Sequence, residues 1–246
     1  MGDKAVREEH YRHEYKYPLT CGQIRIEEAR IRGIMEKDVY AAAGFYNIRS
    51  LYFDDYDNGC YMENENGVDN REKFRIRIYN GSADRIALER KQKVRGKTAK
   101  SSCVISRRQC LELMEGKIPS ETGPSQQVLR RLACQMAVRL MRPAVIVDYD
   151  RIPYVYRTRD ANVRVTFDCN LTAVSQVQDF LEREVHGRGV MPKGQALMEV
   201  KFDSFLPDEI HSLLQLEGLC ASTFSKYYLC RRFAVNLPQN LPQSLR

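Results

Sequence analysis

The sequence lacks the features that define several large classes of protein. No apolar run approaches the roughly 20 residues needed to cross a bilayer, and residues 1–10 contain no apolar signal-peptide segment. The eight cysteines form no C-x-x-C pair, and the four histidines form no H-E-x-x-H motif. We therefore expect neither a membrane span nor a disulfide framework nor a zinc site. Free thiols in a reducing cytoplasm fit this pattern best.

The chain also shows no internal repeat and no linker that would divide it. Its 246 residues suffice for one sizeable domain or two small ones. We predict a single domain over residues 1–235. Residues 236–246 are polar and punctuated by proline, and we expect them to form a disordered tail.

The charge balance is basic, with 39 Lys and Arg residues against 32 Asp and Glu residues, a net charge of +7 and a pI near 9.0. A hydrophobic content of 43% is ordinary for a globular protein. Basic proteins of this kind favour acidic partners: nucleic acid, anionic membranes or phosphate-rich small molecules. Composition alone does not choose among them.

Residues 71–100 combine dense positive charge with a strand pattern. Asn80-Gly81 predicts a tight turn, and apolar and polar residues alternate on both sides of it. Because side chains two apart share a face of a strand, this hairpin has one apolar and one cationic face. The cationic face carries Lys73, Arg75, Arg77 and Tyr79 on one arm and Glu89, Lys91 and Lys93 on the other, followed by Lys97 and Lys100.

Two interpretations of this cationic face remain open. Most charged strand faces are simply solvated. However, like charges placed opposite each other on a sheet repel by a few tenths of a kcal/mol per pair. So many cations with one interleaved acid, Glu89, therefore also indicate a polyanionic ligand.

Further strands and helices are predicted along the chain. An acid and a base share one strand face in Glu14-x-Lys16, Glu89-x-Lys91 and Glu199-x-Lys201. Besides the hairpin, we expect strands at 13–17, 48–53, 60–64, 103–105, 145–151, 154–157, 162–168 and 197–202. We expect helices at 23–43, 106–114, 124–141 and 207–217.

The predicted strands have polar faces that need an explanation. A two-layer sandwich would place those faces outside, whereas a closed barrel would turn them inward and cover its apolar exterior with helices. We prefer the barrel because it accounts for more of the pattern. Stacked Arg and Lys side chains inside it could hold a chain of phosphates, and interleaved acids could hold a divalent cation.

Nine short motifs in order resemble one known family. They are R-x-E-x-K-Y at 12–17, S-L-Y-F-D at 50–54, R-E-K-F-R-I-R-I-Y at 71–79, L-E-R-K at 88–91, G-K-x-x-K at 96–100, Y-D-R at 149–151, V-R-V-T-F-D at 163–168, M-E-V-K at 198–201 and F-S-K-Y at 224–227. Together they resemble the catalytic domain of the vacuolar transporter chaperone (VTC) polyphosphate polymerases, a branch of the triphosphate tunnel, or CYTH-like, superfamily. Triphosphate-hydrolysing relatives often begin with E-x-E-x-K, so Arg12 in place of the first acid favours the polymerase branch.

The resemblance implies an α+β fold, a closed eight-stranded antiparallel β-barrel with helices packed outside. It also implies a polyphosphate polymerase that transfers the γ-phosphate of ATP to inorganic polyphosphate with Mn²⁺ or Mg²⁺. The implied catalytic residues are Arg75, Arg77, Lys91 and Arg164. The implied phosphate-binding residues are Lys16, Lys97, Lys100, Arg151, Ser225 and Lys226, and the implied metal ligand is Glu199.

Several alternatives stay open. Glu14 and Glu89 could be metal ligands or ion-pair partners of the lysines. Within the same fold, a tripolyphosphatase or nucleoside triphosphatase would use water as the acceptor. A non-catalytic module could bind polyphosphate or nucleic acid, but the cationic hairpin face offers only Tyr79 for base stacking, so we expect no nucleic acid. A membrane-associated partner is compatible with the sequence.

Overall fold

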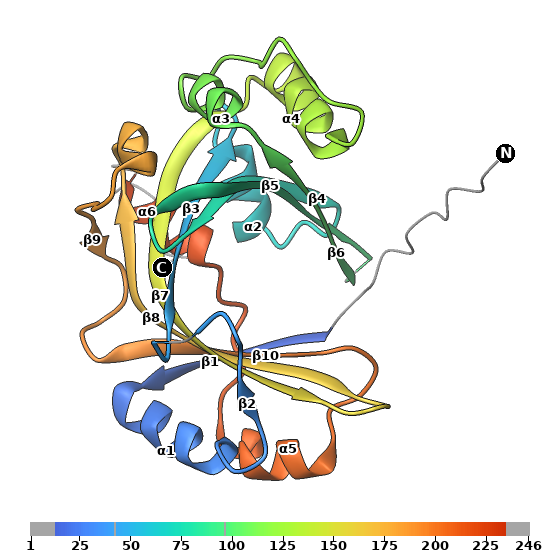
Figure 1. Cartoon of the computed structure of the whole chain (residues 1–246), viewed down its shortest axis with the longest axis vertical. Helices are drawn as coiled ribbons and strands as arrows, with labels where there is room; N and C mark the ends of the chain where they lie inside the picture. The colour runs from blue at the N-terminus through green and yellow to red at the C-terminus, as the bar shows by residue number, and fades with distance from the viewer. Residues whose placement is uncertain (1–12, 42, 96, 235–246) are drawn as a thin grey trace, which may run out of the picture.

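The protein is described here by a computed structural model that covers residues 13–41, 43–95 and 97–234, without the side chain of Lys97 (Figure 1). Arg12 and the tail predicted over 236–246 lie outside these residues. The single domain predicted over 1–235 stays a prediction.

Ten strands of the described chain form one antiparallel sheet. Eight lie in the order β1-β10-β8-β7-β3-β4-β5-β6, while β2 pairs with β7 and β9 pairs with β8. Their bounds are β1 (His13–Thr20), β2 (Glu36–Lys37), β3 (Tyr46–Asp54), β4 (Arg71–Tyr79), β5 (Ser82–Val94), β6 (Lys97–Ile105), β7 (Arg142–Arg157), β8 (Asn162–Val174), β9 (Arg188–Gly189) and β10 (Gln195–Phe202).

Six α-helices and two 3₁₀ helices accompany the sheet within the described residues. They are α1 (Cys21–Ile31), α2 (Gly59–Glu65), α3 (Arg107–Met114), α4 (Gln127–Val138), α5 (Asp208–Leu213), α6 (Lys226–Ala234), η1 (Val177–Leu181) and η2 (Leu216–Gly218). Over that part of the chain, none of the helices combines the length and the apolarity that crossing a membrane requires. The eight cysteines are all free thiols.

The sheet is strongly curved, and helices lie against its outer side at both ends (Figure 1). In the view of Figure 1, α3 and α4 cover the upper end and α1 and α5 cover the lower end. Apolar strand residues such as Phe74 and Leu88 join residues of α3 and α4 in one core. Val165 and Met198 join residues of α1 and α5 in a second core. The predicted α+β fold, with an antiparallel sheet and covering helices, is confirmed.

The prediction of a closed eight-stranded barrel is wrong, because the described sheet has ten strands and its end strands β1 and β6 do not pair with each other. Another segment lies along the free edge of β1: the Ser222 N–H donates to the Lys16 carbonyl at 2.8 Å. The Lys16 ammonium donates to the Phe224 carbonyl at 2.8 Å. The open side is bridged by an ion pair between Lys91 on β5 and Glu14 on β1, at 2.9 Å.

The helix predicted over 23–43 is too long. It begins with the capping box of Thr20 and Gln23 but ends at Ile31. Gly33 follows, and glycine has a low helix propensity. Glu36–Lys37 then forms β2 by pairing with Val155 and Tyr154 on β7. Met35, between the end of α1 and β2, is buried in the second core.

The extended segment predicted at 60–64 is also wrong, because these residues belong to helix α2. The buried Asp54 carboxylate accepts hydrogen bonds from the backbone N–H groups of Cys60 and Tyr61. These bonds satisfy donors that a helix start leaves without partners. The carboxylate lies several residues upstream, outside the local pattern.

Other predicted elements are confirmed or extended. The hairpin over 71–100 forms β4, β5 and the start of β6, and the helix predicted at 106–114 is α3, which begins with a capping box of Ser106 and Gln109. The two strands predicted at 145–151 and 154–157 are one strand, β7, in which Pro153 lies opposite Thr166 of β8. Helix α6 was not predicted.

We expect the substitution Phe74→Ala to lower the free energy of unfolding by about 3–5 kcal/mol, because the fully buried ring would leave a cavity. Urea denaturation would measure the change. Val104→Ala on β6 is the control, since that side chain is 55% exposed, and its cost should stay below about 1 kcal/mol. Equal losses in the two variants would contradict the proposed core.

Candidate functional site

The inner face of the curved sheet lines a cavity of about 390 Å³. This volume lies within the range of small-molecule sites, roughly 300–1,000 Å³. Its lining is unusually basic: among the described residues, twelve Lys or Arg side chains face three Glu side chains. The basic members are Lys16, Arg71, Lys73, Arg75, Arg77, Arg90, Lys91, Lys93, Lys100, Arg151, Lys201 and Lys226.

Strand register explains how so many cations meet on the upper wall of the cavity. Residues directly opposite each other on β4, β5 and β6 form rows across the sheet. One row is Arg75–Glu89–Ser102, the next is Lys73–Lys91–Lys100, and the last is Arg71–Lys93–Thr98. The cationic face predicted for the hairpin therefore points into the cavity.

Glu89 is the counter-ion of the first row. Its carboxylate lies 2.7 Å from Arg75 Nη2, 2.6 Å from Lys100 Nζ and 3.8 Å from Arg77 Nη1. Burial acts to raise the pKa of the Glu89 carboxyl, but these three cations hold it well below its ordinary value of 4.5. The side chain therefore remains an anion that fixes two guanidinium groups.

Glu199 on β10 organises a second cluster on the opposite wall. Its Oε1 accepts from Lys226 Nζ at 2.6 Å, and its Oε2 accepts from Lys201 at 2.8 Å and Arg151 at 3.1 Å. Asp168 binds the same Arg151 and Lys226, each at 2.6 Å. Burial acts to raise the pKa of Glu199, yet the surrounding cations leave it far below the ordinary value.

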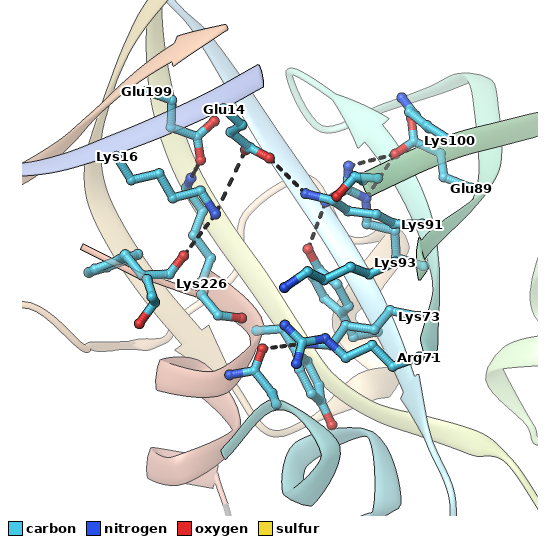
Figure 2. A pocket seen from close by; sticks show the side chains of 18 of the residues that line it. Glu14, Lys16, Arg71, Lys73, Glu89, Lys91, Lys93, Lys100, Glu199 and Lys226 are labelled. Atoms are coloured by element: carbon cyan, nitrogen blue, oxygen red, sulfur yellow. Dashed lines mark hydrogen bonds and ion pairs between the residues drawn. The ribbon is translucent and has the colours of Figure 1, made fainter. Parts of the chain in front are cut away.

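Glu14 on β1 connects the two walls, as Figure 2 shows. Its carboxylate lies 2.9 Å from Lys91 Nζ, 3.5 Å from Lys201 Nζ and 3.7 Å from Lys16 Nζ. Burial lowers the pKa of Lys16, an effect that Glu14 and Glu199 oppose. Glu14 and Glu89 thus act as ion-pair partners of the cavity cations in this structure.

Three tyrosine side chains that line the cavity contact its cations. The Tyr52 hydroxyl accepts from Arg75 Nη1 at 2.7 Å, and the Arg75 guanidinium lies 5.6 Å from the Tyr52 ring centre. Lys226 Nζ lies 5.1 Å from the centre of the Tyr149 ring. Tyr227 also lines the cavity, and it hydrogen-bonds to the buried Asp54 carboxylate. Cation–π contacts of this kind hold basic groups in place without neutralising them.

The unpredicted helix α6 brings residues 225–227 to the cavity. The Ser225 hydroxyl accepts from the Tyr228 N–H at 3.3 Å and so caps the helix start. Lys226 is the first helical residue, and Asp168 and Glu199 raise its pKa against the lowering effect of burial. A short polar motif near the end of the chain thereby becomes part of the site.

The structure gathers most of the residues that the sequence singled out. Those lining the cavity are Lys16, Arg75, Arg77, Lys91, Lys100, Arg151, Glu199, Ser225 and Lys226. Arg164 is not among the lining residues, because its Nη2 binds Asp38 at 2.8 Å and the Tyr46 hydroxyl at 2.9 Å. Lys97 begins β6, but its side chain is not described.

The fold brings to the site several residues that have no individual role among the sequence-based predictions. Those that line the cavity or bind its cations are Tyr52, Arg71, Lys73, Lys93, Tyr149, Asp168, Lys201 and Tyr227. The strand alternation already placed Lys73, Lys93 and Lys201 on polar faces, so that signal could have included them. No local signal identifies Tyr52, whose contact with Arg75 depends on strand pairing between β3 and β4.

A divalent metal can be tested against the donor set. No group of three or more His, Cys, Asp or Glu side chains suitable for a metal is present among the described residues. Mg²⁺ sites commonly need only one or two carboxylates when phosphate oxygens and water supply the other ligands. Glu199, with Glu14 nearby, offers carboxylate oxygens to a metal that is also bound by phosphate, and the metal would replace part of the bonds from Lys226, Lys201 and Arg151.

The fold and the cavity define a class of protein, one in which a curved antiparallel sheet encloses a cation-lined site. The family model of the VTC domain matches residues 11–235, and the chain belongs to the VTC domain family. A comparison with curated proteins finds no match.

The solved structures to which the chain is similar have low sequence identity to it. One is an adenylyl cyclase-named protein from Hippeastrum described as having a dominant triphosphatase activity, with 15% identity, a TM-score of 0.50, and coverage of 93% of this chain and 98% of that one. An adenylate cyclase-named protein from Bacillus halodurans shows 12% identity and a TM-score of 0.47, covering 83% of this chain and 87% of that one. The Hippeastrum likeness shows the fold alone.

Acid should destabilise the protein through its buried carboxylates. The folded-state pKa values of Glu14, Glu89 and Glu199 lie below the ordinary 4.5. Their stabilising contribution is therefore complete above pH 4.5 and is lost as the pH falls through the folded-state values. Urea denaturation in phosphate-free buffer from neutral pH to about pH 3 should show this loss.

Glu89→Gln separates this effect from general acid unfolding. We expect it to cost about 3 kcal/mol at neutral pH, because it leaves buried cations without their partner, and to flatten the acid dependence. Glu115→Gln, which removes a surface ion pair with Lys117, should leave both unchanged. A Glu89→Gln protein with unaltered acid dependence would contradict the assigned charge state.

Proposed function

We propose that this protein is a polyphosphate polymerase that transfers the γ-phosphoryl group of ATP to the end of a polyphosphate chain held in the cavity. The observation that carries the proposal is the lining itself, twelve basic side chains against three carboxylates. Such a surface fits a linear polyanion, since each phosphoryl unit brings negative charge and several acceptor oxygens. Membership of the VTC domain family supports the same substrate class.

For phosphoryl transfer, the protein mainly has to position the reacting groups and neutralise the charge of the phosphate oxygens. Arg75, Arg77 and Lys91 lie on adjacent strands facing one cavity, where they would clamp the transferring group. Arginine suits this role because its planar guanidinium makes paired hydrogen bonds to phosphate oxygens. Lys16, Lys100, Arg151 and Lys226 would bind neighbouring phosphoryl units, with Ser225 as a further contact.

The carboxylates fix the positions of the cations in the site. Glu89 holds two guanidinium groups and Glu199 holds three cations at hydrogen-bonding distance. Donors fixed in this way need little reorganisation when charge develops in the transition state. A phosphate that enters the cavity would share these cations with the carboxylates.

Glu199, with Glu14 nearby, would hold Mn²⁺ or Mg²⁺ together with phosphate oxygens. When bound, the metal would neutralise charge on those oxygens. Arg164 and Lys97 are further candidates for phosphate contacts. Arg164 would first have to exchange its bond with Asp38 for one with phosphate.

Hydrolysis is the second candidate. The Hippeastrum protein of similar fold is described as having a dominant triphosphatase activity, and the same cations could bind a triphosphate while water acts as the acceptor. Nucleic-acid binding is less favoured. The cavity tyrosines Tyr52 and Tyr149 already have cations over their rings, so they offer no open platform for bases. A cytoplasmic location agrees with the free thiols.

Incubation of the purified protein with ATP and Mn²⁺ or Mg²⁺ tests the proposal. We expect a ladder of polyphosphate chains on a gel together with release of ADP. Free phosphate without chains would identify a hydrolase instead. No turnover with either metal, combined with tight polyphosphate binding, would identify a binding module.

Arg75→Gln should lower kcat by about 100-fold or more, because it removes a donor aimed at the transferring group. The control is Arg107→Gln on α3, an exposed arginine outside the cavity that removes the same charge. Steady-state kinetics with ATP would compare them. Similar kcat values in the two variants would rule out a catalytic role for Arg75.

Glu199→Gln should weaken the response to metal. We expect a lower rate and a higher Mn²⁺ or Mg²⁺ concentration at half-maximal rate, because an amide is a poorer ligand than a carboxylate. Circular dichroism would verify that the variant folds without its ion pairs. An unchanged metal dependence would contradict the assignment of Glu199 as the metal ligand.

A further inference from the structure

One end of the cavity differs from the rest in its charge balance. Nine of the twelve basic side chains that line it in the described chain lie within 4 Å of a carboxylate. Three do not: Arg71, Lys73 and Lys93 have no carboxylate partner among the described residues. We call these three residues the unbalanced group.

The register of β4 and β5 brings the unbalanced group together. Arg71 lies directly opposite Lys93, and the next inward pair on the same face is Lys73 with Lys91. Like charges in such cross-strand pairs repel each other. In Figure 2 these side chains extend from one wall toward the hollow that Glu14 and Lys16 face from the other. The group therefore continues the cationic lining beyond the Glu89 cluster.

Neutral contacts hold two members of the group in place. Arg71 Nη1 donates to the carbonyls of Glu63 and Val68, each at 3.0 Å. Lys73 Nζ donates to Asn64 Oδ1 at 3.0 Å and lies 4.9 Å from the Tyr227 ring centre. These contacts orient the charges without cancelling them.

Two observations distinguish the group from ordinary solvated cations. Lys73 lines the cavity with no carboxylate partner among the described residues, and burial, followed by the charge of Arg71, lowers its pKa to about 7. Lys93 also lines the cavity and has no hydrogen-bond or ion-pair partner in the described part of the chain. An anion placed between these side chains would relieve both conditions.

We propose that Arg71, Lys73 and Lys93 form a separate anion subsite that binds a phosphoryl unit of a linear chain extending beyond the carboxylate-balanced part of the cavity. The inference rests on the proposed function, since the balanced part must hold the preceding phosphoryl units. It adds a length preference: the site favours linear condensed phosphates that reach both regions over a single triphosphate.

The electrostatics give a reason for this preference. A phosphoryl unit in the balanced region must share its cations with Glu14, Glu89 or Glu199. A unit at the unbalanced group meets no competing carboxylate among the described residues. Each phosphoryl unit added there gains charge-assisted hydrogen bonds. The affinity for a linear polyphosphate should therefore rise steeply once the polymer is long enough to reach the unbalanced group.

Calorimetric binding to tripolyphosphate and to a linear polyphosphate several times longer tests the subsite. The wild-type protein should bind the longer chain more tightly. The double variant Arg71→Gln/Lys93→Gln should lose about tenfold or more of its affinity for the longer chain, as expected for charge-assisted bonds. Its affinity for tripolyphosphate should fall by less, because the shorter ligand can still bind the cations that the carboxylates balance.

A charge-matched control is Arg25→Gln/Arg107→Gln, which removes two exposed arginines from α1 and α3 outside the cavity. It should retain the wild-type affinity for both ligands. The single variant Lys93→Gln guards against misfolding, because Lys93 has no described partner to lose. It should show part of the same selective loss.

Three outcomes would overturn the subsite. They are equal wild-type affinity for the two ligands, equal loss of both ligands in the double variant, or an equal loss in the charge-matched control. Each leaves the proposed function standing if ATP still yields polyphosphate chains. Failure of the wild-type protein to bind either ligand would instead refute the proposed function along with the subsite.

Discussion

Repulsion among like charges on the concave face of one sheet is the constraint on which this structure depends. Twelve basic side chains line the cavity, and the acids that line it within the described residues are Glu14, Glu89 and Glu199. Asp168 and Glu72 pair with three of the twelve cations from outside the lining. The three lining carboxylates remain ionised because cations surround them, which overrides the effect of burial on their pKa values. Each carboxylate connects different strands, so the same interactions that balance the charge also hold the walls of the cavity together.

The apolar faces of the strands offset the free-energy cost of gathering these charges. Two hydrophobic cores lie outside the cavity, one under α3 and α4 and the other under α1 and α5. Burial of their aliphatic and aromatic side chains supplies the favourable free energy that the charged interior does not. The apolar faces of the strands therefore point outward, where helices cover them, and the charged faces point into the cavity. An anionic ligand is the natural complement of that interior.

Much of the candidate site could be predicted from the sequence because strand alternation is a local property. The period of two placed Arg75, Arg77 and Lys91 on one face, and the structure turns that face into the cavity. Local pattern failed where a distant group decided the outcome. The Asp54 carboxylate accepts from the first turn of α2 across six residues, and Lys226 of α6 contacts Glu199 across 27 residues; neither contact belongs to the helical or strand periodicity. The closed barrel was wrong because residues 222–224 lie along the free edge of β1.

By itself, then, the sequence determined the alternating strands, their basic faces and the order of the motifs that places the chain in the VTC domain family. Only the tertiary structure decided which acid neutralises which cation, that Arg164 binds Asp38, and that Arg71, Lys73 and Lys93 have no carboxylate among the described residues. The physical reason is that alternation depends on neighbours one or two residues away. Charge balance depends instead on side chains that approach from strands far apart in the chain.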